Sequence, residues 1–263
     1  MADENPFRMK ELSPEGPFVL GDELCTERRK DFLLRGNNIL ASYANIATFS
    51  NLGLQQVKAL KVTTDTPMRL TIGGRVIQCK HRTLIDMYPA SLKQLANQTF
   101  TVIYGNFEAY IVDVIVDAFE IMKVENPQQD ALKLLAMKGW EGKIDSIGQK
   151  IGVSVGKRQF QEKFKSIPME FAGQSCSDSI SFLQKIADLR HLIVHSAGRV
   201  DERLARAHPE ANLKKGEDIA VPVELPFDLH LFLIAFTDVF DKAFADKFNW
   251  ERNLIQPEYL VRK

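Results

Sequence analysis

The stretch IADLRHLIVHSAGRVDERLAR, residues 186–206, holds the side chains of this sequence that are best suited to chemistry. It places Arg190, His191 and His195 within six residues, although the whole chain has only five histidines. Histidine transfers protons near neutral pH, and arginine offers a planar fork of donors that fits phosphate. Metal-free cleavage of a phosphodiester needs a base for the ribose 2′-hydroxyl, an acid for the leaving 5′-oxygen and a cation for the charge at phosphorus. These are the residue types that such a reaction requires.

The three residues fall on a predicted helix over residues 178–195, with Ser177 or Asp178 as its N-cap and Gly198 just after its end. At about 100° per residue, the helix has one apolar face and one polar face. The apolar face consists of Phe182, Ile186, Leu189 and Ile193, and the polar face carries Asp188, His191 and His195. The last turn of the helix also favours the positive form of a histidine, because the helix dipole is negative there.

Arg190 lies nearer to the apolar face, where a charge is costly unless it is paired. A partner is available in FEAYIVDVIVDAFEIM, residues 107–122, because Glu108 falls in the middle of an apolar helical face. We therefore predict a buried salt bridge between Glu108 and Arg190. A purely structural role for both residues, in which they snorkel or hold two helices in register, remains open.

Two other chemistries could use residues of the same cluster. Asp188, His191 and His195 have the i, i+3, i+7 spacing of residues that converge on a metal ion. However, Leu192 stands where the HExxH zinc motif has its glutamate, and no second His or Cys pair lies nearby. A Cys176–His195 pair would join opposite ends of the predicted helix. We expect neither a metal nor a cofactor.

Composition limits the setting in which these residues act. Lys+Arg and Asp+Glu both number 34, so any nucleic-acid site has to be a local patch. The three cysteines are far apart, which favours reduced thiols in a cytoplasm. The N-terminus has no apolar signal segment, and the acidic residues among positions 100–122 argue against a membrane span. We expect a cytoplasmic protein that does not enter a membrane.

Helical periodicity dominates the chain and predicts a mainly α fold, a helical bundle with one small β-hairpin. The hairpin is predicted for MRLTIGGRVIQC, residues 68–79, because apolar and polar residues alternate around a Gly-Gly pair. Helices are predicted over residues 26–60, 90–123, 128–137, 142–150, 157–166, 178–195, 199–211 and 227–248.

These elements suggest four successive segments. Residues 1–22 contain three prolines and predict a flexible N-terminal arm. An N-terminal helical region with the hairpin follows over residues 23–94, and a second helical domain over residues 95–250. Residues 251–263 form a C-terminal tail.

The segment ADLRHLIVHSAGRVDERL resembles the signature of the HEPN superfamily, in which an arginine is followed after four to six residues by a histidine. The motif maps onto Arg190, His191 and His195. The helix that carries NFEAYIVDV resembles the first helix of the HEPN bundle, which assigns Glu108 to the site. The likeness covers roughly residues 95–248 and is strongest to ribosome-associated and phage-defence members.

The resemblance implies a helical bundle that dimerises, so that two Arg/His motifs share a cleft and cut RNA without metal. It also implies a toxin or antiviral role and an antitoxin or other defence-system partner protein. In one HEPN branch, adenylylation of a tyrosine two residues after the histidine silences the toxin. Ala197 occupies that position here, which argues against this form of control.

Two functions of different classes follow from the sequence. The first is a metal-independent endoribonuclease that acts as a homodimer on an RNA substrate. The second is a non-catalytic HEPN scaffold that binds RNA or a partner protein through its helices. The sequence favours the ribonuclease, because members that have lost catalysis usually lack the arginine or the histidine, and both are present here.

Overall fold

A computed structural model describes residues 24–60, 62–63, 65–72, 75–164, 169–171, 174–176, 178–209, 212–219 and 221–254. The predicted N-terminal arm at residues 1–22 lies outside these ranges, as does most of the predicted tail at residues 251–263. The described chain is mainly helical, with a few short strands, as the sequence predicts.

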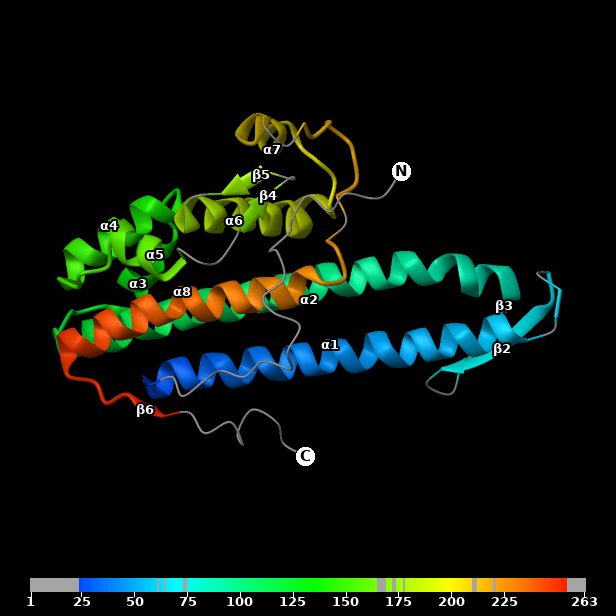
Figure 1. The fold of residues 1–263 in the computed structure, drawn as a ribbon, viewed down its shortest axis with the longest axis horizontal. Coiled ribbons are helices and arrows are strands. Elements are labelled where there is room, and N and C mark those ends of the chain that lie inside the picture. Colours follow the sequence, from blue (N-terminus) through cyan, green and yellow to red (C-terminus); the bar gives the residue numbers. More distant parts are fainter. Residues whose placement is uncertain are drawn as a thin grey trace.

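Three long helices form the framework of the molecule: α1 (Glu27–Ala59), α2 (His81–Ile121) and α8 (Leu225–Phe248). Figure 1 shows them side by side along the longest axis, and each packs against the other two. Thr26 caps α1, because its side chain accepts a hydrogen bond from the backbone N–H of Arg29. Among the described residues, the framework joins the first helix to the last.

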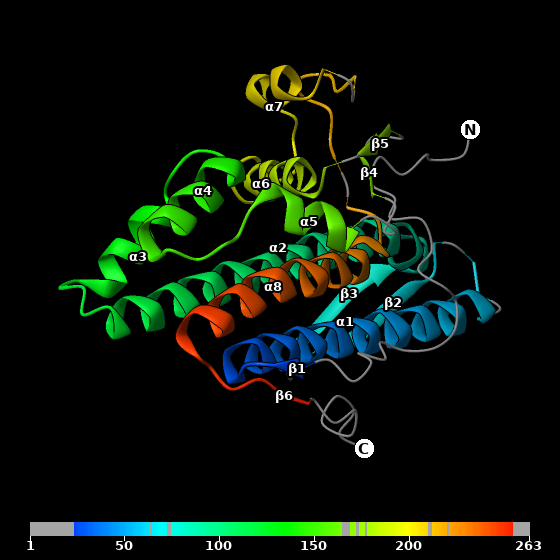
Figure 2. The ribbon, with the colours of Figure 1, turned by 60° about the vertical axis from the view of Figure 1, so that its left-hand side comes forward.

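Five shorter helices cover one side of this framework (Figure 2). They are α3 (Pro127–Leu135), α4 (Trp140–Ile151), α5 (Lys157–Phe164), α6 (Ser179–Ser196) and α7 (Glu202–Ala207). The helix α6 packs on α2, α4 and α5, whereas α7 stands apart above it (Figures 1 and 2). The predicted helices at 128–137, 142–150, 157–166 and 178–195 are all present, with ends shifted by at most two residues.

Three two-stranded antiparallel pairs complete the described fold. The predicted hairpin is confirmed as β2 (Pro67–Ile72) and β3 (Arg75–Lys80), and it lies at the free end of α1 and α2 (Figure 1). The sequence did not predict the other two pairs. They are β1 (Leu24–Cys25) with β6 (Asn253–Leu254), and β4 (Met169–Phe171) with β5 (Gln174–Cys176).

The helix α2 begins nine residues earlier than the sequence predicts, and Pro89 lies inside it. An interior proline removes a backbone hydrogen bond and costs roughly 3 kcal/mol. α2 packs against α1, and the His81 ring at its start hydrogen-bonds to the backbone oxygen of Val57 in α1 at 2.7 Å, so tertiary contacts support the early start of the helix. The expected boundary between residues 94 and 95 falls inside α2, and buried residues of α1 such as Phe32 and Leu33 belong to the common core.

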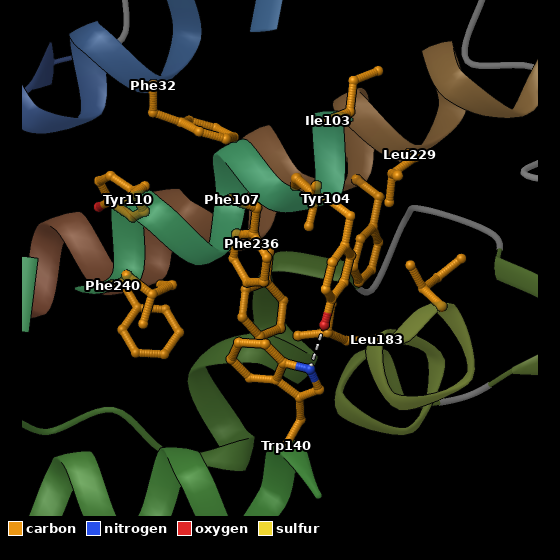
Figure 3. Close-up of a cluster of buried hydrophobic side chains, with 14 of the residues drawn as sticks. Phe32, Ile103, Tyr104, Phe107, Tyr110, Trp140, Leu183, Leu229, Phe236 and Phe240 are labelled. Carbon is orange, nitrogen blue, oxygen red and sulfur yellow. Dashed lines mark hydrogen bonds between the residues drawn. The ribbon is translucent and has the colours of Figure 1, made fainter. Parts of the chain in front are cut away.

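The core between the framework and the shorter helices is rich in aromatic rings, several of which are drawn in Figure 3. Phe236 of α8 makes an edge-to-face contact with Phe107 of α2 and a stacked contact with Phe160 of α5. Trp140 at the start of α4 donates its indole N–H to the hydroxyl oxygen of Tyr104 at 2.9 Å (Figure 3). These contacts fix α2 and α4 next to the residues predicted for the site.

By length and composition alone, α2 is apolar enough to cross a membrane, although the acidic residues at 100–122 argued against a span. Half of its most apolar stretch is buried inside the fold, as expected for a core helix. The helix also carries Asp117, which makes an ion pair with Arg28 of α1 at 2.6 Å.

Candidate active site

The helix α6 has the two faces that the sequence predicts. Asp178 caps it by accepting a hydrogen bond from the N–H of Ile180 at 3.2 Å. The chain leaves the helix at Ala197 and Gly198, both of which have positive φ angles. Of the predicted apolar face, Phe182, Ile186 and Leu189 are buried and Ile193 packs against the core. His191 is half-buried and His195 is exposed, so the histidine face points away from the core.

Arg190 and Glu108 form the predicted pair across α6 and α2. Arg190 Nη2 lies 3.8 Å from Glu108 Oε2, and the two side chains are 31% and 33% exposed. The prediction that this pair is buried was wrong, because both side chains extend to the margin of the contact between the helices. Arg190 Nε is enclosed and has no hydrogen-bond partner among the described residues. Arg190 therefore keeps an unused donor.

His191 and His195 face each other one helical turn apart. Their ring centroids are 4.3 Å apart, with an angle of 44° between the planes. Burial lowers the pKa of His191, and the positive charges of Arg203 and His195 lower it further. A lowered pKa keeps His191 neutral at neutral pH, so that it is able to accept a proton.

Asp188 makes its contacts with the segment around α7, and it does not share a metal site with His191 and His195. His208 donates a hydrogen bond from Nε2 to Asp188 Oδ2 at 3.1 Å, and Gln184 donates one to Oδ1 at 3.2 Å. Burial raises the pKa of Asp188, but the hydrogen bonds from His208 and Gln184 outweigh this effect and leave the pKa below its usual value. Within the described ranges, no three His, Cys, Asp or Glu side chains gather as metal ligands.

Four further residues border this cluster, and the sequence did not single them out. Arg203 of α7 lies 4.0 Å from Asp188, and His208 follows directly after α7. Lys143 of α4 stands 4.7 Å from the centre of the Trp140 ring; burial lowers its pKa and the charge of Glu108 opposes this shift. Burial and the charge of Glu108 raise the pKa of Tyr104 well above its usual range. Only tertiary packing brings these residues together, so no spacing in the sequence identifies them.

The Cys176–His195 alternative receives no support from the backbone. Cys176 ends β5, ahead of the first turn of α6, whereas His195 lies in the last turn. An 18-residue helix is about 27 Å long, which separates the two residues by most of that length. The side chain of Cys176 lies outside the described part of the structure.

No family model, curated protein or solved structure matches this chain. The likeness to HEPN proteins therefore depends on the Arg190, His191 and His195 motif and on Glu108. The structure adds two pairs on the same helix: the Arg190–Glu108 ion pair toward α2, and the adjacent imidazole rings of His191 and His195 on the outer face of α6.

Proposed function

We propose that this protein is a metal-independent endoribonuclease of a toxin or antiviral defence system and that it acts in the cytoplasm. The observation that carries the proposal is the pair of imidazole rings, His191 and His195, 4.3 Å apart on the helix that also carries the Arg190–Glu108 ion pair. This cluster combines proton-transfer groups with a phosphate-binding cation at the protein surface. The reaction needs no metal ligand and no cofactor.

In the proposed reaction, a neutral imidazole removes the proton of the ribose 2′-hydroxyl. The 2′-oxygen then attacks phosphorus, and the bond to the 5′-oxygen breaks. A protonated imidazole gives its proton to the leaving 5′-oxygen, which yields a 2′,3′-cyclic phosphate and a 5′-hydroxyl. The lowered pKa of His191 suits the base, and Arg190 stabilises the charge that develops on the phosphate oxygens.

A second copy of the chain completes the site. His191 and His195 lie on one face of α6 with their rings 4.3 Å apart, so both approach a phosphate from the same side. In-line displacement requires the base and the acid on opposite sides of phosphorus. We therefore assign the base to one protomer and the acid to its partner, across a two-fold axis beside α6.

Two measurements test the shared site. Size-exclusion chromatography with light scattering should give about twice the chain mass of 29.8 kDa. Mixing inactive His195→Ala protomers with inactive Arg190→Ala protomers should restore cleavage, because the mixed dimer keeps groups from both chains. A monomer that cuts RNA would rule out the shared site.

The ends of the RNA products test the reaction itself. In EDTA, the protein should leave 2′,3′-cyclic phosphate and 5′-hydroxyl ends, because the attacking oxygen belongs to the substrate. Products with 3′-hydroxyl and 5′-phosphate ends, or activity lost in EDTA, would mean attack by a metal-activated water and would contradict the proposal.

The alternative is a non-catalytic HEPN scaffold that binds RNA or a partner protein, such as an antitoxin or defence-system component. Exposed apolar side chains on α1 favour this alternative: Ile46, Phe49 and Leu52 are 50%, 71% and 54% exposed. Growth of the expressing cell separates the two functions. A ribonuclease arrests growth and its His195→Ala variant does not, whereas a scaffold gives the same growth with either protein.

A further inference from the structure

The positive charge of this neutral chain is concentrated in one part of the sequence. Residues 50–95 contain seven Lys and Arg against two Asp and Glu, whereas the rest of the chain contains 27 against 32. These residues form the end of α1, the β2–β3 hairpin and the start of α2, which we call the extension. Figure 1 shows the hairpin at the end of the molecule opposite α3 and α4.

Most of the cations on the extension are available to a ligand. Five of them are exposed and make no ion pair with any described residue: Lys58, Arg69, Arg75, Arg82 and Lys93. Lys80 is paired with Asp65 at 3.1 Å. On the hairpin, Arg69 is paired in register with Gln78, and both side chains are exposed. Val76, which is 62% exposed, lies on the same face, and Arg75 lies on the opposite one, so each face of the hairpin offers one exposed arginine.

The cations of α2 lie on the same side of the helix as the candidate active site. At 100° per residue, Lys93 and Arg82 lie about 60° and 80° around the helix from Glu108. With a rise of 1.5 Å per residue, they stand about 22 Å and 39 Å along the axis from Glu108. That length corresponds to roughly a dozen stacked nucleotides at about 3.4 Å each. Asp86 is the single acidic residue of this stretch of α2.

The exposed apolar side chains of α2 lie on a different side. Met87 and Val102, which are 59% and 52% exposed, stand about 120° to 180° around the helix from Lys93 and Arg82. A helix that lies on a membrane instead has cations flanking the apolar face that enters the lipid. The cationic side of α2 therefore fits a polyanion in water better than a lipid surface.

We propose that the extension binds the phosphate backbone of the RNA substrate and leads the strand toward Arg190 and His195. The cations are spread singly along the extension, which matches the regular spacing of phosphates along an RNA strand. This inference rests on the proposed ribonuclease function, because it gives the substrate of that site a second contact. If the extension binds RNA in this way, the affinity for long RNA depends on residues far from the candidate active site.

The test compares two variants that lose the same charge. One is Arg69→Gln/Arg75→Gln/Arg82→Gln on the extension, and its control is Lys138→Gln/Lys150→Gln/Arg158→Gln, which removes three exposed cations from the region of α3 to α5. Both are made with His195→Ala, so that the RNA stays intact. Fluorescence anisotropy then measures binding of a labelled single-stranded RNA of about 30 nucleotides over a range of salt concentrations.

The extension variant should bind at least tenfold more weakly near 0.15 M salt, and its salt slope should fall by about 2, since each lost phosphate contact removes about 0.7. The control variant should bind like the parent. With His195 present, the extension variant should cut long RNA more slowly but cut a substrate of about four nucleotides at the parental rate.

Equal binding by the two triple variants would overturn the inference, whether or not the RNA is cut. The inference would also be overturned if the parent bound no RNA. It would likewise be overturned if the extension variant lost binding to anionic vesicles or to an acidic peptide but kept its binding to RNA. Failure of the ribonuclease proposal gives a different result: RNA binding that depends on the extension, with no cleavage by the unchanged protein.

Discussion

The ion pair between Arg190 and Glu108 sits where water reaches both side chains. Each is about one third exposed and the closest atoms are 3.8 Å apart, so solvent weakens their attraction. The pair therefore contributes little to folding. We expect the pair to limit the orientations of the Arg190 guanidinium, which is held toward α2 by Glu108.

Glu108→Gln keeps the size of the side chain and removes its charge. We expect the free energy of unfolding to change by less than about 1 kcal/mol, because the pair is screened. RNA cleavage should slow at least tenfold, because Arg190 loses the partner that orients it. Urea denaturation and initial cleavage rates measure the two effects.

Asp113→Asn is the matched control, because Asp113 also lies on α2 and forms a long, exposed ion pair of 3.9 Å with Arg28. This variant should cut RNA at the unchanged rate. Equal cleavage rates for the Glu108→Gln protein and the unchanged protein would remove Glu108 from the site.

Asp188 has a different role, because it connects α6 to the segment that contains α7. Asp188→Asn removes the charge that holds His208 and Arg203, and we expect a loss of about 1–3 kcal/mol of stability around α7. Hydrogen exchange of the α7 amides should become faster. Asp218→Asn, which removes an exposed partner of Arg199, should leave this exchange unchanged. Unchanged exchange in Asp188→Asn would show that Asp188 does not hold α7.

For individual residues, the sequence predicts the contacts that follow from helical spacing. Arg190 and Glu108 each stand out as a charge on an apolar helical face, which identifies them as partners before the fold is known. The burial of the pair could not be predicted, because it depends on how far apart α2 and α6 pack. His208 carries no comparable signal, since it follows a short helix and reaches Asp188 only through the turn before α7.

Among the elements, α1 and α8 approach each other closely at Gly36. A Cβ atom on Gly36 would lie 2.0 Å from Cε1 of His230, whose side chain is fully buried. The imidazole N–H of His230 donates to the Asn37 side-chain oxygen at 3.1 Å. The ring therefore fills the space above the glycine and fixes the spacing of the two helices.

Gly36→Ala should destabilise the protein by about 1–3 kcal/mol, because the buried ring has to move. Gly53→Ala is the control on the same helix: nothing lies within 4 Å of the added atom, so the better helix former should stabilise by about 0.5–1 kcal/mol. Thermal unfolding of both variants gives the comparison. Stabilisation of equal size in both would contradict the close approach.

The elements themselves were largely predictable, since periodicity and capping residues identify each helix of the described fold. Three features were not, and one of them is the β4–β5 pair. The continuation of α2 through Pro89 depends on packing against α1, which outweighs the local preference of proline. The β1–β6 pair joins residues from opposite ends of the chain, and two-residue strands have no pattern of their own.

For the whole molecule, the buried imidazole of His230 ties stability to pH. Burial lowers the pKa of His230 to about 4, whereas an exposed histidine in the unfolded chain titrates near 6.5. As the pH falls from about 6.5 toward 4, the unfolded chain takes up a proton that the folded protein does not. Folding is therefore favoured above this window and loses stability within it.

Between pH 7 and pH 5, His230 should account for a loss on the order of 1–2 kcal/mol in the free energy of unfolding. Urea denaturation at the two pH values measures this loss. His230→Gln has no group that titrates here, so its stability should fall by correspondingly less over the same interval. An equal fall in both proteins would mean that His230 is not held neutral by the fold.

The proposed ribonuclease function is tested most directly by the rate of RNA cleavage in EDTA with and without His195. The His195→Ala protein should cut at least about a hundredfold more slowly than the unchanged protein, because a proton-transfer group typically contributes 10²–10⁴-fold. Its thermal stability should stay the same, since His195 is exposed at the end of α6. Ser181→Ala, an exposed change at the other end of α6, should keep the full rate. Cleavage by the His195→Ala protein at the unchanged rate would contradict the account.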